Sequence, residues 1–138
     1  MFESTSKRHP PFRLQIIPDA GPDTSLPFHQ IGTDGGLLDA PVMVGRRGAD
    51  GNPAGPQVTV APAERADLVV DFSGFAPGDE LTLENIRIPD FPFWDEATTG
   101  KVMKLRVVES SGPDTSVLPA TLRPVPRLDP ADAVMTRN

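Results

Sequence analysis

Residues 57–85, QVTVAPAERADLVVDFSGFAPGDELTLEN, decide the fold class of this chain. Three runs within them, at residues 57–60, 66–72 and 80–85, are rich in valine and leucine, and the last alternates polar and apolar side chains. Segments 62–65 and 76–79 separate the runs, and both contain residues that favour turns. The stretch therefore predicts short β-strands joined by tight turns.

Strand-like runs continue on both sides of this stretch, at residues 12–17, 28–33, 41–44 and 102–108. Together they make about seven strands, at spacings that fit a β-sandwich or β-barrel. The 17 prolines and 12 glycines of the chain argue against long helices. We expect one all-β domain at residues 1–110 and a proline-rich extension at residues 111–138.

Length and charge exclude several classes of protein. A chain of 138 residues allows one domain. Its net charge is −6, its isoelectric point is about 4.8, and no cluster of lysine and arginine interrupts the acidic character. We therefore expect neither nucleic acid nor an anionic membrane surface as a partner. No apolar run approaches the roughly 20 residues of a membrane span, and the first eight residues lack the apolar core of a secretory signal. The sequence predicts a soluble chain and leaves its compartment unknown.

The residue types needed for metal or covalent chemistry are scarce. Cysteine is absent, which excludes disulfides, thiolate ligands and cysteine nucleophiles. The two histidines, His9 and His29, belong to no spaced metal motif, and a blue-copper site would need a cysteine as well. Paired acidic residues such as Asp67 and Asp71 match no calcium loop, so we interpret them as surface or turn residues. We predict no catalytic, cofactor-binding or metal-binding residue in this chain.

Two polar motifs are predicted to be structural. Asp34, Gly35 and Gly36 form a tight turn after residues 28–33, because glycine accepts positive φ at no steric cost. Arg65 lies between Glu64 and Asp67, and an arginine–carboxylate pair there would fix the start of the next strand. We expect Arg65 to be more buried than an average arginine and bonded to a carboxylate or to backbone carbonyls.

An aromatic cluster at residues 91–94, FPFW, has two interpretations. It caps the core, or it contacts a neighbouring domain.

Three strings resemble the middle domain of three-domain multicopper oxidases. They are FHQIGTDGGLL at residues 28–38, VAPAERADLVVDF at residues 60–72 and LTLEN at residues 81–85, with VMKLRV following at residues 102–107. The ordered set is most similar to the branch of bacterial spore-coat laccase, bilirubin oxidase and phenoxazinone synthase. Residues 118–122, with Thr136 and Arg137, resemble the linker to the third domain of that branch.

The resemblance implies a cupredoxin-like Greek-key β-barrel. In that family the copper ligands lie in the first and third domains, and no position of this sequence matches them. The resemblance therefore implies a non-catalytic scaffold whose partners are the first and third cupredoxin domains. The copper belongs to the parent enzyme, which would oxidise phenols, amines or metal ions and reduce dioxygen to water. The alternative is a stand-alone β-sandwich that binds a partner and has no redox activity.

The N-terminus departs from the family pattern, because the strand that should precede residue 10 has no counterpart. We expect an exposed sheet edge as a consequence. Either the N-terminal arm or the tail lies along this edge, or a second copy of the chain pairs with it. Of these, we expect association between copies.

Overall fold

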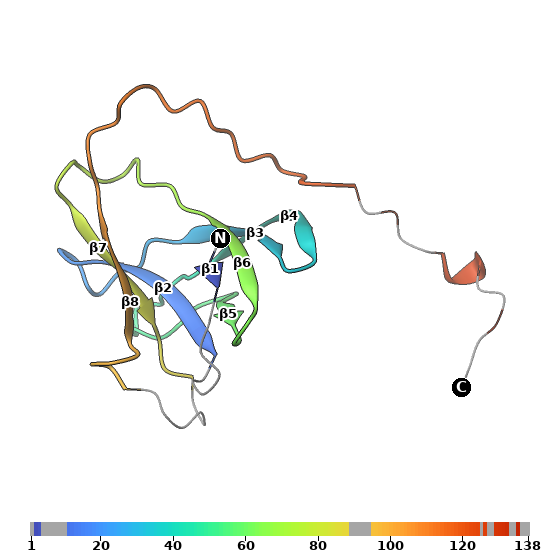
Figure 1. Ribbon diagram of the computed structural model, residues 1–138, viewed down its shortest axis with the longest axis horizontal. Helices are drawn as coiled ribbons and strands as arrows, with labels where there is room; N and C mark the ends of the chain where they lie inside the picture. Colours follow the sequence, from blue (N-terminus) through green and yellow to red (C-terminus); the bar gives the residue numbers. More distant parts are fainter. Residues whose placement is uncertain are drawn as a thin grey trace.

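The computed structural model describes residues 2–3, 11–88, 95–124, 126, 129–132 and 135 (Figure 1). These residues form eight strands in two four-stranded sheets, with strand orders β1-β6-β3-β4 and β5-β2-β7-β8. The strands are β1 (Phe2–Glu3), β2 (Phe12–Pro18), β3 (Phe28–Thr33), β4 (Gly36–Val44), β5 (Val58–Val60), β6 (Arg65–Val69), β7 (Glu80–Asn85) and β8 (Lys101–Arg106). A short 3₁₀ turn, Pro130–Asp132, lies in the tail, and no helix in the described part of the chain is long and apolar enough to cross a membrane.

The expected all-β class is confirmed, and the expected strands agree with β2 to β8. Several boundaries differ, and β8 ends at Arg106 instead of residue 108. β4 begins at Gly36 instead of residue 41, directly after the predicted turn, and pairs with β3 on both sides of a register shift between Gln30 and Gly32. β6 ends at Val69, before the expected residue 72. The start of β4 lacks an alternating pattern, so only its pairing with β3 reveals it.

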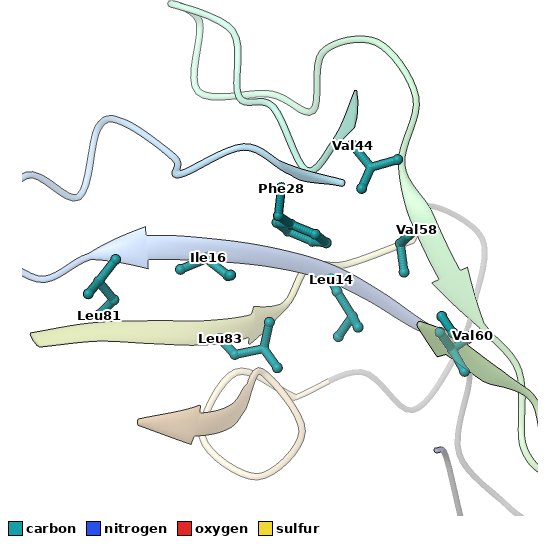
Figure 2. Packing of buried hydrophobic residues seen from close by; sticks show 9 residues of the cluster. Leu14, Ile16, Phe28, Val44, Val58, Val60, Leu81 and Leu83 are labelled. Carbon is teal, nitrogen blue, oxygen red and sulfur yellow. The ribbon is translucent and has the colours of Figure 1, made fainter. Parts of the chain in front are cut away.

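The core lies between the two sheets. Nine buried apolar side chains from both sheets form one cluster, and Figure 2 shows Phe28 pointing from β3 toward β2. Strand β7 illustrates how the sequence pattern produces this core, because Leu81 and Leu83 are buried while Thr82 and Glu84 are half-buried. Alternation with period two directs one set of side chains inward.

Among the residues that the structure describes, Gln15 and Asn85 are buried polar side chains, and both have partners. Asn85 Oδ1 accepts a hydrogen bond from Arg13 N at 2.9 Å, and its Nδ2 donates to Thr99 O at 3.1 Å. Gln15 Nε2 donates to Arg46 O at 3.1 Å. The first set of bonds ties β7 to β2 and to the loop before β8. The second holds the segment after β4 over the outer side of β2.

The sheet edges are partly covered by the chain itself. In the N-terminal arm, Phe2 pairs with Ala66 and Glu3 with Arg65, so β1 adds to the free side of β6. In the tail, Leu122 N donates to Asp39 O at 2.9 Å on the free side of β4. Figure 1 shows the tail leaving β8 and passing β4. Both coverings that we considered are thus present, and association between copies stays a prediction.

Candidate functional site

The corner between β3 and β6 holds the motif residues Asp34 and Arg65. Arg65 Nε lies 2.6 Å from Asp34 Oδ1, and Arg65 N donates to Asp34 Oδ2 at 3.0 Å. The side-chain hydrogen bond from Arg65 lowers the pKa of Asp34, and the backbone bond acts in the same direction. The carboxylate partner is therefore Asp34 and not Glu64 or Asp67. The expected burial of Arg65 is wrong, because 44% of its side chain is exposed.

Glu64 and Asp67 have local roles in the same corner. Glu64 N donates to Ala61 O at 3.0 Å, while Glu64 Oε2 accepts from Ala61 N at 2.8 Å, which closes the turn reciprocally. Ala63 has a φ of 70° in this turn, a conformation that favours glycine. Asp67 covers Gly32 so closely that a Cβ at Gly32 would lie 2.7 Å from Asp67 Oδ2. These contacts fit a structural corner.

The tight turn after β3 carries the two motif glycines. Gly36, at the start of β4, has a φ of 104°, a conformation that glycine adopts without the steric cost of a side chain. Gly35 N donates to Thr33 Oγ1 at 3.4 Å. The turn positions Asp34 for its bonds to Arg65, which is 31 residues away in the sequence.

The described residues do not provide a copper centre. In the part of the chain that the structure describes, no three His, Cys, Asp or Glu side chains lie close enough together to hold a metal ion. His29 lies on β3, where its register partners are Met43 and Val69. The sequence has no cysteine, so the thiolate ligand that a blue-copper site requires is missing. His9 and the aromatic cluster at residues 91–94 lie outside the described residues.

The outer face of the sheet that contains β7 and β8 is charged. Lys104 bonds to Asp19 and lies 3.6 Å from Glu80, and Arg106 lies 3.8 Å from Glu80. The hydrogen bond from Lys104 lowers the pKa of Asp19, and the same bond raises the pKa of Lys104. This face is a network of exposed ion pairs, which suits contact with water.

The other sheet presents a different outer face. Met43, His29 and Val69 lie side by side across β4, β3 and β6. The exposed fraction is 45% for Met43 and 37% for Val69. We call these three residues the apolar row. The row places two half-exposed apolar side chains on either side of His29.

A groove of about 930 Å³ continues from the apolar row. It lies between the end of β6, the segment at residues 70–77 and the start of the tail. Most of its lining is apolar, as the following residues show: Val69, Val70, Phe72, Phe75, Pro77, Val107, Val108 and Leu118.

Two carboxylates, Asp71 and Asp114, also line the groove. Asp71 Oδ1 accepts from Ser73 N at 2.8 Å, and this backbone bond lowers the pKa of Asp71. Asp114 Oδ1 accepts from Ser116 N at 2.8 Å, and bonds from Ser116 lower the pKa of Asp114. Both groups are therefore ionised at neutral pH. The groove could not be predicted from the sequence, because its walls come from segments about 40 residues apart. The closely spaced Phe72 and Phe75 are the local signal that the sequence offers.

Comparison with known proteins relates this chain to oxidases. No family model matches the sequence. The chain is 38% identical to the bilirubin oxidase of Albifimbria verrucaria over 110 residues, which are 75% of this chain and 17% of that protein. It is 32% identical to the multicopper oxidase LPR1 of Arabidopsis thaliana over 114 residues, which are 81% of this chain and 18% of that protein. The chain thus spans less than a fifth of the length of these relatives.

Solved structures agree with the sequence relatives. The McoA multicopper oxidase of Aquifex aeolicus matches with a TM-score of 0.61 and 30% identity, and its 2F4 variant with 0.66 and 29%. Each match covers 90% of this chain and 24% of the oxidase. With the two-sheet fold, these similarities show that the chain is a cupredoxin-like domain of the multicopper oxidase family.

Proposed function

We propose that this chain is the non-catalytic middle domain of a three-domain multicopper oxidase and holds two copper-bearing domains together. The observation that carries the proposal is the similarity to a segment of much longer oxidases, in a chain without cysteine and with only two histidines. Copper held by the other domains would supply the electron transfer. The residues of this chain supply binding surfaces, of which the apolar row is the first candidate.

The domain boundaries follow from the same proposal. Residues 1–110 form the domain body, and residues 111–138 form the linker toward the third domain. The extended course of the tail in Figure 1, with one backbone bond to β4, supports a linker. The parent enzyme would couple the oxidation of phenols, amines or metal ions to the reduction of dioxygen.

Metal analysis of the purified chain tests the scaffold role. After loading with Cu²⁺ and dialysis, we expect far less than one copper per chain and no oxidase turnover on a phenolic substrate. Stoichiometric copper with a blue absorption band would contradict the proposal. The flanking coding sequence supplies an independent test, because the parent enzyme needs His-x-His segments upstream and a His-Cys-His segment downstream.

A stand-alone binding module is the second candidate. It is favoured by the way the chain covers its own edges, with β1 on β6 and Leu122 on β4. Flanking sequence without histidine-rich copper motifs would support this alternative.

A further inference from the structure

We propose that the groove between residues 70–77 and the tail receives a basic side chain, arginine or lysine with apolar neighbours, from a protein segment of an adjacent domain. This inference rests on the proposed function, because a middle domain needs such a contact. It assigns a docking position and a partner chemistry to one surface of the domain.

The shape of the groove favours an amphipathic occupant. Val69 and Val107 belong to its apolar lining, and Phe72 and Phe75 also pack against the core, which holds them in place. At about 930 Å³ the groove admits several side chains. It adjoins the apolar row through His29 and Val69, which belong to both. An occupant can therefore bury apolar surface over the sheet and in the groove together.

Charge complementarity selects the polar part of the occupant. Asp71 and Asp114 lie close enough to repel each other electrostatically. The described residues that line the groove include no lysine or arginine. By contrast, Asp19 and Glu80 at the opposite sheet are paired with Lys104 and Arg106. Two carboxylates beside an apolar lining favour a cation on an apolar stem, and the planar guanidinium of arginine suits a carboxylate pair best.

The position of the tail favours a protein segment over a free amine. Residues 110–118 form one wall of the groove, and the same chain continues past β4. In the proposed arrangement this chain leads to the next domain, so the tether holds that domain near the groove at high effective concentration. A contact that is weak between separate molecules is then sufficient.

Titration by NMR spectroscopy tests the inference with the whole 138-residue chain. The probes are two peptides, acetyl-Gly-Phe-Arg-Phe-Gly-amide and the same peptide with glutamate in place of arginine. We expect the arginine peptide to shift the amide signals of Ser73, Val107 and Ser116 in a saturable manner, and the glutamate peptide to shift them weakly. The double variant D71N/D114N should bind the arginine peptide about tenfold more weakly, because asparagine retains the backbone bond and removes the charge.

A matched double variant controls for net charge. D23N/D129N removes two exposed carboxylates outside the groove, and it should bind the arginine peptide like the parent chain. Equal binding of the two peptides, or an equal loss in both double variants, would overturn the inference. Phenethylamine saturating the same signals at the same concentration would make the groove a small-molecule site and overturn protein docking. If the amide signals of Ser73, Val107 and Ser116 move when the chain is diluted without peptide, the occupant of the groove is a second copy of the chain. That result would overturn docking of an adjacent domain.

The copper test is independent of this result. A chain that binds no copper but fails the peptide test keeps the scaffold role and loses the docking position. A chain that binds copper stoichiometrically loses the scaffold role whatever the peptides do.

Discussion

Replacing the buried Asn85 by alanine should produce a large loss of stability in this fold. Its side chain is 2% exposed, and its bonds to described residues include those to Arg13 N at 2.9 Å and Thr99 O at 3.1 Å. Each of these bonds contributes about 1 kcal/mol net, and leaving the two backbone groups without their partner adds about 1 kcal/mol in total. We therefore expect Asn85→Ala to lower the free energy of unfolding by about 3 kcal/mol, which corresponds to a fall in Tm of about 10 °C.

Urea unfolding followed by far-ultraviolet circular dichroism measures this loss. Asn52→Ala is the matched control, because Asn52 is exposed and its side chain bonds only to the nearby Asp50 among the described residues. It should shift the urea midpoint little. A loss below about 1 kcal/mol for Asn85→Ala, with an unchanged m-value, would show that these bonds do not stabilise the fold as argued.

Four further changes have expected outcomes in the same unfolding assay. Ala63→Gly should raise the free energy of unfolding by about 1 kcal/mol, because it relieves a φ of 70°. Gly45→Ala should lower it by about 3 kcal/mol, because the new Cβ would lie 2.4 Å from Phe28 Cε1 at a φ of 75°. The pKa of Asp34 is lower in the folded chain than in the unfolded chain. The ionised Asp34 therefore stabilises the fold above the unfolded pKa, near 4, and this stabilisation is lost as pH falls through the folded pKa. Asp34→Asn should therefore reduce the acid-induced fall of the urea midpoint below about pH 5. Burial raises the pKa of Glu84, so its ionisation costs stability above the unfolded pKa; Glu84→Gln should raise the midpoint at neutral pH and have no effect near pH 3.

Controls for the backbone changes come from the same chain. Ala49 is exposed and its φ is negative, so Ala49→Gly should lower stability where Ala63→Gly raises it. Gly74 has open space around a built Cβ and no positive φ, so Gly74→Ala should not destabilise the fold. Equal changes in stability for Gly45→Ala and Gly74→Ala would contradict the argument from backbone strain. Equal changes for Ala63→Gly and Ala49→Gly would contradict it as well.

The corner at Arg65 shows where reasoning from neighbours in the sequence fails. Glu64 and Asp67 lie within two residues of Arg65 in the sequence, yet Asp34 makes the ion pair because β3 and β6 are neighbours in one sheet. The pair lies at the surface, and 44% of the side chain of Arg65 is exposed to solvent. Strand order and register decided both outcomes, and neither is encoded within a short window.

The all-β class and most of the strands could be predicted from the amino-acid sequence, because alternation of side chains and turn chemistry are local properties of the chain. The sequence also determined that no thiolate copper ligand exists, since that follows from the absence of cysteine. The first half of β4, the partner of Arg65 and the groove at Asp71 and Asp114 follow from the three-dimensional arrangement of the strands. Strand pairing within one sheet places β4 and β6 beside β3, and the groove forms where the end of β6 meets the start of the tail. No local pattern in the sequence specifies these contacts.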